Sequence, residues 1–461
     1  MSITTDPKRE IIKDFQEAIK EKKISTGQKD TINFRNDILN KKEREIFSVD
    51  LNLLRYRKEN GRISSSVLGY EKEKGFLHPD QEDAQCKIKE FLLDKDPEKT
   101  EELKKMLKAE GQREPGIITC DGFLINGNRR KAALEEIHKE NPSDEKFARM
   151  KVVILPGEGE EGGPPTLKEI EQIENRYQLQ SDGKAEYFGF DAALSIKQKI
   201  GVGFSLKEQL RDNPIYKNMP DKDFKTVLKK EEQKLKALEC IDRYLSMFSR
   251  DGQYQQISKG IGDPQGRWQA FIDYANTWNK LQKPRERAKH QIEDTDIEIL
   301  EQVAFKAIRL RDIPSVGKKI HQIMREIPVL WQHGKDALIE LNKNVEVDIP
   351  TKDQVDSEGN QLPLLEIDKK WEAQFQNQIS YQIREAMHAA AQEKEQQQPL
   401  NLLEDAYKKL IHKDMKIETI NASDLGKAIK FTNDIKQKAV ELGSEIFKRK
   451  KAKSKNNQNS Q

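Results

Sequence analysis

The segment IITCDGFLINGNRRKAAL, residues 117–134, constrains the fold of this chain more than any other part of the sequence. It contains two short apolar runs rich in β-branched and aromatic residues, and Asp121-Gly122 between them is typical of a two-residue hairpin turn. Asn126 and Gly127 end the second run, and a helical apolar period begins at Ala132. The sequence therefore predicts a β-hairpin joined to a helix at Gly127.

A helix that begins at such a junction is suited to bind an anion. Its first backbone N–H groups and its dipole face any ligand placed there, and Gly127 permits close approach of the backbone. Arg129 and Arg130 add charged guanidinium groups, which can donate paired hydrogen bonds to an anion. The alternative is a surface hairpin followed by an ordinary basic helix, although each arginine then opposes the helix dipole by roughly 0.3–1 kcal/mol. Spacing alone leaves both interpretations open.

Residues 127–133, GNRRKAA, match a strand-to-helix phosphate motif of the form G-E-R-R-x-R-A. Three further pieces follow in the order found in the same family: residues 49–54 with Asn60-Gly61-Arg62, residues 111–118, and Ile173-Glu174-Asn175-Arg176. Together the four pieces resemble the nucleotide-binding domain of the ParB/sulfiredoxin-like superfamily. The resemblance covers residues 47–176 and at its widest reaches residue 248.

The resemblance implies a bound nucleoside triphosphate, CTP or ATP, together with Mg²⁺. It assigns nucleotide contacts to the following residues: Arg62, Gln112, Gly127, Asn128, Arg129, Arg130, Asn175 and Arg176. Glu174 and Asn175 would hold Mg²⁺, and Glu174 is also the candidate catalytic residue. Asn128 departs from the acidic residue usual in the family, and the stretch between Tyr56 and Gly111 is unusually long. The sulfiredoxin cysteine is missing from the motif, which argues against sulfinic-acid reduction.

Charged residues make up 35% of the 461 residues, well above the roughly 25% of a typical globular domain, and apolar residues also make up 35%. We therefore expect an α+β fold class, with a small ParB/sulfiredoxin-like mixed-sheet domain followed by a long, mainly α-helical region. The net charge of +3 does not by itself indicate a nucleic-acid-binding protein, so any such role depends on local basic patches. The three cysteines show no metal-ligand spacing, and no apolar run reaches the ~18 residues of a membrane span. A cytoplasmic or nucleoid-associated protein is expected.

Composition shifts and turn signals divide the chain into seven expected parts. They are a helical arm at 1–45, opened at Asp6-Pro7; a ParB-like nucleotide-binding domain at 46–176; a helix-turn-helix-like region at 177–250; a helical domain at 251–350; a linker at 351–364; a helical region at 365–447; and a basic disordered tail at 448–461. Pro314, Pro328 and Gln396–Pro399 are expected to interrupt helices.

The acidic loop GEGEEGGPP, residues 157–165, follows the predicted buried strand Val152–Leu155. We interpret the loop as a surface insertion, with a lid over the phosphate site as the alternative. Further along, four aromatic residues recur at three- and four-residue steps: Trp268, Phe271, Tyr274 and Trp278. This spacing is more typical of a core-facing helix than of a base-stacking platform.

Two basic clusters are expected to contact DNA: Lys222, Lys225, Lys229 and Lys230 on a helix predicted to start at Pro220, and Lys448, Arg449, Lys450 and Lys451 in the tail. A helix capped by Ser205 precedes the first cluster, and the pair resembles the helix-turn-helix that follows the nucleotide domain in partition proteins. The alternatives are a solvated lysine-rich helix face and a solubilising terminus.

The resemblance favours a nucleotide-binding, DNA-associated protein of the ParB-like kind, in which nucleotide and Mg²⁺ control a clamp or an assembly. Plasmid partition, mobile-element maintenance and antiphage defence all use such proteins. Two alternatives remain open. One is a nucleotide-hydrolysing or phosphotransfer enzyme of the same fold, such as a slow nucleoside triphosphatase. The other is a helical assembly scaffold with a degenerate nucleotide site, which forms a homo-oligomer or binds a partner protein through its helices.

Overall fold

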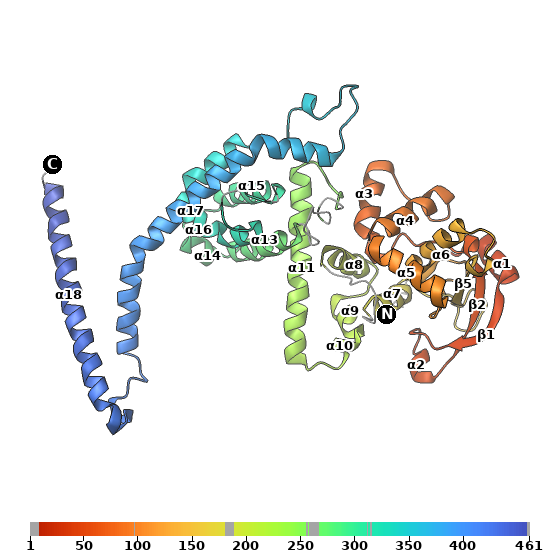
Figure 1. Cartoon of the computed structure of the whole chain (residues 1–461), viewed down its shortest axis with the longest axis horizontal. Helices are drawn as coiled ribbons and strands as arrows, with labels where there is room; N and C mark the ends of the chain where they lie inside the picture. The colour runs from red at the N-terminus through yellow and green to blue at the C-terminus, as the bar shows by residue number, and fades with distance from the viewer. Residues whose placement is uncertain are drawn as a thin grey trace, which may run out of the picture. The chain divides into compact units, whose positions relative to one another are not determined.

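The computed structural model describes residues 9–95, 97–179, 189–254, 257, 267–310, 312–313 and 316–458, and Figure 1 shows the course of the chain. The chain divides into two compact units, Met1–Ala390 and Ala391–Gln461. The first unit contains a mixed sheet with its helices, followed by a long, mainly helical region. This architecture confirms the expected α+β class.

Five strands form one mixed sheet in the order β1-β2-β5-β3-β4. Their bounds are β1 Ile24–Asp30, β2 Arg44–Asp50, β3 Gly116–Ile118, β4 Leu124–Asn126 and β5 Arg149–Ile154. Only β3 and β5 pair in parallel, whereas the other neighbours are antiparallel. The predicted hairpin is confirmed as β3 and β4. Its loop is longer than the predicted two residues, because the Thr119 N–H bonds the carbonyl oxygen of Phe123 and closes the turn outside Asp121-Gly122.

Helices cover both faces of the sheet. They are α1 Lys13–Lys22, α3 Ser64–Lys74, α4 Glu82–Lys95, α5 Pro97–Glu110, α6 Asn128–Glu140 and α7 Leu167–Leu179, with the short helices α2 Asp37–Asn40, η1 Leu51–Leu53, η2 Gly61–Ile63 and η3 Glu145–Phe147. Successive strand residues point to opposite faces, so Ile118 and Val152 pack with α6 whereas Ile117 and Val153 pack with Ile170 of α7. The strongly apolar strand Val152–Leu155 was predicted correctly, because β5 is buried on both faces.

The expectation of a purely helical arm over residues 1–45 is wrong. Helix α1 begins at Lys13, and the edge strand β1 follows it directly and pairs with β2. The polar sequence ISTGQKD of β1 has no apolar alternation, since nearly all of its residues are exposed, and the sequence pattern therefore carries no strand signal. The predicted start at Asp6-Pro7 lies outside the described residues.

The helical region begins at α8 and has its own core. Its helices are α8 Gly189–Gly201, α9 Leu206–Asp212, α10 Pro214–Lys217, α11 Asp221–Met247, α13 Trp268–Leu281, α14 Pro284–Lys289, α15 Asp296–Arg309, α16 Ile320–Asn344, η4 Thr351–Asp353 and α17 Leu364–Leu410. Trp268, Phe271 and Tyr274 lie in the core, as the aromatic spacing predicted. Ser205 and Glu208 form a capping box at α9, which confirms the predicted cap.

Two predicted interruptions are absent. Pro328 lies inside α16, where it is buried, and packing of the apolar face outweighs the ~3 kcal/mol that an internal proline costs. The backbone of α16 instead departs from helical geometry at Gly334, where an added Cβ would come within 2.5 Å of the Ala386 Cα atom. Helix α17 also continues through Pro399, which no contact explains. Pro314 lies outside the described residues.

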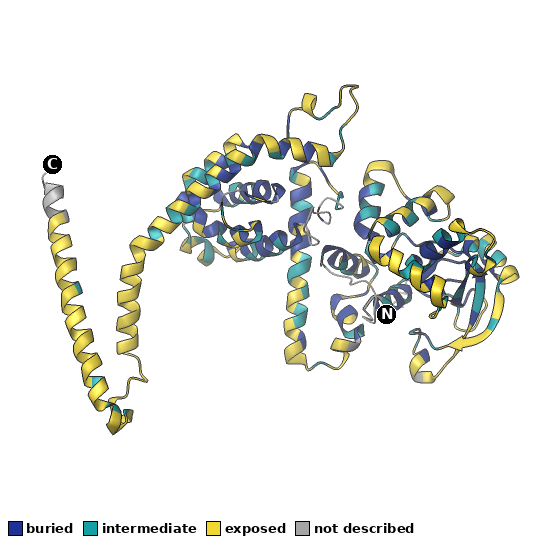
Figure 2. Ribbon diagram, viewed as in Figure 1, coloured by how far each residue is buried: buried dark blue, intermediate teal, exposed yellow. Residues whose placement is uncertain are grey.

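The second unit consists of the last part of α17, η5 Ile417–Thr419, η6 Ala422–Asp424 and α18 Leu425–Gln458. Figure 2 shows that this unit is exposed almost throughout. Many large apolar residues are among its exposed side chains: Leu400, Leu403, Tyr407, Leu410, Ile411, Ile429, Phe431, Ile435, Val440 and Phe447. The prediction of disorder from residue 448 is wrong up to Gln458, because α18 includes these residues. No helix among the described residues is long and apolar enough to cross a membrane.

Candidate functional site

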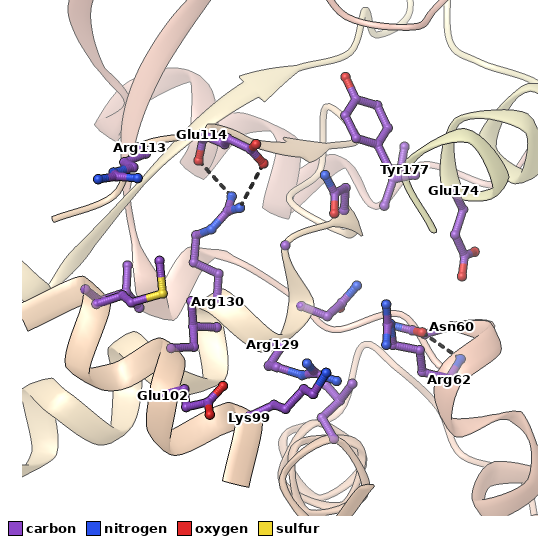
Figure 3. Close-up of a pocket in the computed structure, with 18 of the residues that line it drawn as sticks. Asn60, Arg62, Lys99, Glu102, Arg113, Glu114, Arg129, Arg130, Glu174 and Tyr177 are labelled. Atoms are coloured by element: carbon purple, nitrogen blue, oxygen red, sulfur yellow. Dashed lines mark hydrogen bonds and ion pairs between the residues drawn. The ribbon is translucent and has the colours of Figure 1, made fainter. Parts of the chain in front are cut away.

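A pocket of about 400 Å³ opens at the junction between β4 and α6 (Figure 3). Helix α5, the turn at residues 111–114, η2 and α7 form its walls. Its volume falls within the range of small-molecule binding sites, roughly 300–1,000 Å³. The pocket therefore places the junction predicted from the sequence at the floor of a ligand-sized cavity.

Gly127 gives the junction its shape. It is the N-cap of α6 and has a φ of 99°, a left-handed conformation that glycine adopts at little cost. A Cβ atom at this position would lie 2.7 Å from the Met150 Cε atom and 3.4 Å from the Gly116 Cα atom. The N-cap makes no side-chain hydrogen bond to the first turn. The first turn of α6 thus receives no cap from Gly127, and its residues Asn128, Arg129 and Arg130 line the pocket.

Cationic side chains reach this end of α6 from three elements. Arg129 comes from α6 itself, Lys99 from α5 and Arg62 from η2. In Figure 3, Lys99 and Arg129 point toward the same space, which Arg62 borders from η2. Glu102 of α5 also lines this part of the pocket, and the dipole of α6 adds a positive potential at the helix N-terminus.

Two more arginines of the lining, Arg113 and Arg130, form ion pairs with glutamates. The Arg130 guanidinium donates to the Glu114 carbonyl oxygen at 2.7 Å and lies 3.6 Å from its carboxylate, and burial lowers the pKa of Arg130. Arg113 pairs with Glu110 at 2.7 Å and its side chain is 70% exposed. The contacts of Arg130 hold the 111–114 turn beside α6, whereas the Arg113–Glu110 pair is local to residues 110–113.

Glu174 lies in the middle of α7. One carboxylate oxygen accepts the Gly61 N–H at 2.9 Å, and the other lies 3.5 Å from a guanidinium nitrogen of Arg57. Glu174 therefore holds the first turn of η2, from which Arg62 extends. Arg57 offsets part of its negative charge, and Glu174 also lines the pocket, so its predicted role as a Mg²⁺ ligand or catalytic residue stays a prediction.

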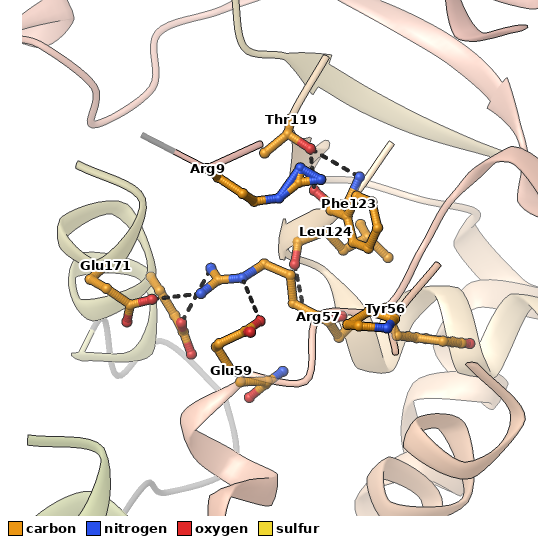
Figure 4. Close-up of polar contacts among 12 residues, drawn as sticks. Arg9, Tyr56, Arg57, Glu59, Thr119, Phe123, Leu124 and Glu171 are labelled. Atoms are coloured by element: carbon orange, nitrogen blue, oxygen red, sulfur yellow. Dashed lines mark hydrogen bonds and ion pairs between the residues drawn. The ribbon is translucent and has the colours of Figure 1, made fainter. Parts of the chain in front are cut away.

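Arg57 is the centre of a buried ion cluster (Figure 4). Its guanidinium donates to Glu171 at 2.6 Å and lies 3.8 Å from Glu59, in addition to its contact with Glu174. Burial opposes the charge of Arg57, but the surrounding carboxylates outweigh burial and raise its pKa. Burial raises the pKa of Glu171, against the opposing charge of Arg57. The cluster joins η2 to α7.

Three of the predicted nucleotide contacts point elsewhere. Gln112 bonds the backbone of Lys151 in both directions and fastens the turn to β5. The Asn175 amide donates to the Gln209 carbonyl oxygen at 3.2 Å, and its own oxygen faces Lys199. Arg176 binds Asp212 and the Asn33 carbonyl oxygen. None of the three lines the pocket, because helical rotation turns residues 175 and 176 of α7 away from it.

The pocket brings together five of the residues predicted to bind nucleotide: Arg62, Gly127, Asn128, Arg129 and Arg130. The Asn128 amide donates to the Leu124 carbonyl oxygen at 3.2 Å, so its side chain ties α6 back to β4. This hydrogen bond to β4 sets the orientation of the Asn128 side chain.

Sequence reasoning missed the contribution of α5. This helix supplies Lys99 and Glu102, together with an apolar wall that includes Leu103, Met106 and Leu107. The signal was the amphipathic period of residues 97–110 inside the unusually long stretch between Tyr56 and Gly111. Tyr177 of α7 adds an aromatic ring on another side, and burial raises its pKa to about 12.

The acidic loop at 157–165 does not line the pocket. Arg35 holds it by donating to the carbonyl oxygens of Gly163 and Pro164, and the same guanidinium pairs with Glu169 at 2.7 Å. These contacts favour the surface-insertion interpretation over a lid.

The basic residues predicted for DNA contact are exposed: Lys222, Lys225, Lys229 and Lys230 on α11, and Lys448, Arg449, Lys450 and Lys451 on α18. The short helix α10 separates α9 from α11, so the connection is longer than that of a helix-turn-helix. Within the described residues, no group of three or more histidine, cysteine or acidic side chains is placed to hold a metal ion.

No protein-family model, curated protein or solved structure matches this chain. Its function is therefore inferred from the residues of the pocket and from the resemblance of their motifs.

Proposed function

We propose that this chain is a nucleoside-triphosphate-binding protein of the ParB-like kind. The observation that carries the proposal is the first turn of α6, which receives no side-chain cap from Gly127 and opens into a ligand-sized pocket bordered by Arg62, Lys99 and Arg129. Helix N-termini with converging cations are suited to phosphate oxygens. The apolar wall of α5 and the ring of Tyr177 would contact the less polar base and sugar.

In this arrangement the phosphates lie against the α6 amides, with Arg129 on their near side and Lys99 and Arg62 opposite. Gly127 keeps the β4–α6 junction in this conformation, because its φ is positive and an added Cβ atom would collide with Met150 of β5. Mg²⁺ would arrive with the triphosphate, coordinated by phosphate oxygens and water. Glu174 and Asn175 are not its ligands in this proposal, since both have other partners.

Binding rather than hydrolysis is the function that the geometry supports best. Hydrolysis needs a group that orients an attacking water next to the terminal phosphate. Among the carboxylates of the lining, Glu110 pairs with Arg113 and Glu114 lies 3.6 Å from Arg130, so Glu102 of α5 is the candidate for that role if the nucleotide is hydrolysed. Glu174 is engaged by Gly61 and Arg57. Control of DNA association or of assembly by the bound nucleotide fits a binding site of this kind.

Isothermal titration with CTP, ATP and GTP tests the proposal. Arg129→Ala should weaken binding of the preferred triphosphate by about 1.5–3 kcal/mol, the scale of a hydrogen bond to a charged group, or roughly 10- to 150-fold. Arg113→Ala is the matched control. It removes an arginine from the same lining, but one that is exposed and pairs with Glu110, so its affinity should stay close to that of the wild type.

Absence of binding for all three nucleotides would refute the proposal. Equal losses in the two arginine variants would also refute it, because the site would then depend on total charge rather than on the α6 turn. Circular dichroism of each variant checks that the fold is kept.

A further inference from the structure

A second cavity of about 580 Å³ lies in the helical region, between α11, α13 and α16. It is lined by charged and amide side chains: Lys229, Glu232, Gln233 and Lys236 of α11, Asp273, Asn276, Thr277, Asn279 and Lys280 of α13, and Lys283 and Arg325. None of these residues belongs to the pocket at Gly127. We call this cavity the basic groove.

The basic groove holds five cations and two carboxylates, a net charge of +3 that equals the charge of the whole chain. Its buried carboxylate, Asp273, is held by Arg325 at 2.8 Å. Lys229, Lys236, Lys280 and Lys283 form no ion pair with the described residues. Elsewhere on α11, by contrast, Lys234 pairs with Glu231. Charge of one sign is thus concentrated around a concave surface, where low-dielectric walls strengthen its field.

The cationic surface continues beyond the cavity along α11. Lys222, Lys225, Lys229 and Lys236 are spaced by three, four and seven residues, so they lie on one face of the helix. At 1.5 Å per residue the row is about 21 Å long. That length matches about six phosphates of one B-DNA strand, which are 3.4 Å apart along the axis, and exceeds a single nucleotide.

Amide side chains complete the lining. Gln233, Asn276 and Asn279 border the groove and offer N–H donors next to the lysines. Phosphate and sugar oxygens of nucleic acids are bound by this mixture of lysine and amide side chains, without reading of the bases. Glu232 lies within the row and lowers its charge, which limits the affinity to that of a non-specific site.

We propose that the basic groove, extended along α11 by Lys222 and Lys225, binds the phosphate backbone of a nucleic acid. This inference uses no residue of the nucleotide pocket, and the two proposals therefore fail separately. It also differs from the sequence-based expectation that α11 enters a DNA groove as a recognition helix. In the proposed arrangement the strand lies across α11 and α13.

The test compares two triple variants of the full chain that lose the same charge. Lys229→Gln, Lys236→Gln and Lys280→Gln together remove lysines of the groove. The control carries Lys13→Gln, Lys20→Gln and Lys22→Gln, three exposed lysines of α1. Binding of a labelled DNA oligonucleotide of arbitrary sequence is measured by fluorescence anisotropy at about 50 and about 200 mM salt.

The wild type should bind and should weaken steeply with salt. The groove variant should bind about 10-fold or more weakly at low salt, and its log–log salt slope should flatten by about 0.9 for each phosphate that the protein no longer neutralises. The control should keep the wild-type slope. Arg129→Ala should bind the oligonucleotide as the wild type does, and the groove variant should bind triphosphate as the wild type does.

Three results would overturn the proposal. One is wild-type protein that does not bind the oligonucleotide at low salt, and another is an equal loss of affinity in the groove variant and the control. The third is displacement of the oligonucleotide by inorganic tripolyphosphate at an equal concentration of phosphate groups, because the groove would then be a site for small anions.

Discussion

Replacement of Arg57 by methionine should destabilise the sheet domain by about 3–5 kcal/mol at neutral pH. The substitution keeps an unbranched apolar side chain but removes the guanidinium and its charge, which leaves Glu171 and Glu174 buried without their cation. Their side chains are only 12% and 4% exposed, so neither carboxylate regains water. Breaking a buried ion pair from one side costs this amount because an uncompensated charge remains.

The buried carboxylates also set the pH dependence of this destabilisation. In wild type, burial already raises the pKa of Glu171, and removal of Arg57 should raise it further. A carboxyl whose folded pKa lies above its unfolded value stabilises the fold at low pH and loses that stabilisation as the pH rises through the folded pKa. The stability difference between wild type and Arg57→Met should therefore be smaller at pH 5 than at pH 7.

Hydrogen exchange of the β2 and β5 amides at increasing urea measures the free energy of unfolding of the sheet domain. Tryptophan fluorescence measured in parallel shows whether the helical region unfolds in the same transition, since all four tryptophans lie between residues 268 and 371 and both regions belong to one compact unit. A destabilisation below about 1 kcal/mol, or one of the same size at pH 5 and pH 7, would show that Arg57 does not neutralise buried carboxylates.

Two further predictions concern Glu174 and Lys306. Glu174→Gln keeps an acceptor for the Gly61 N–H, so the triphosphate affinity of this variant and its Mg²⁺ dependence should match those of the wild type. Glu174→Ala should lower the triphosphate affinity, because η2 and its Arg62 are then no longer held. Loss of the Mg²⁺ dependence in the glutamine variant would instead identify Glu174 as a metal ligand. Burial lowers the pKa of Lys306 to about 8, and its ammonium donates to Asn342. Between pH 8 and pH 10 the unfolded chain therefore binds more protons at Lys306 than the folded chain does. The thermal stability of the wild type, measured relative to that of Lys306→Met, should rise over this range. A stability difference that does not change with pH would contradict the lowered pKa.

The parts of this protein that were predictable from sequence are those with strong local signals. The hairpin, the Gly127 junction and the buried strand β5 each combine apolar patterning with turn residues, and all three occur in the structure. The aromatic residues of α13 were recognisable for the same reason, because their spacing alone defines one helix face. The charge placed at the α6 N-terminus by Arg129 followed directly from its position in the motif.

Other features depend on contacts between distant segments, which patterning does not encode. The contacts of Glu174 with Gly61 and Arg57 could not be predicted, because both partners lie more than a hundred residues away in sequence. Lys99 was missed since nothing in residues 97–110 indicates which face of the helix meets the α6 turn. The edge strand β1 carries a polar sequence, so its pairing with β2 had no apolar signature.

The polar edge strand β1 also determines where this protein can be divided. It covers one side of β2, whose remaining neighbour is β5, and its own outer side presents lysine, glutamine and a left-handed Gly27 that interrupts the pairing register. Such features discourage strands of other molecules from adding to a sheet. A fragment that starts at residue 46 would keep every residue of the pocket at Gly127 but expose β2 as an unprotected edge. Such a fragment should self-associate through that edge, and fragments for biophysical work should therefore begin before Arg9.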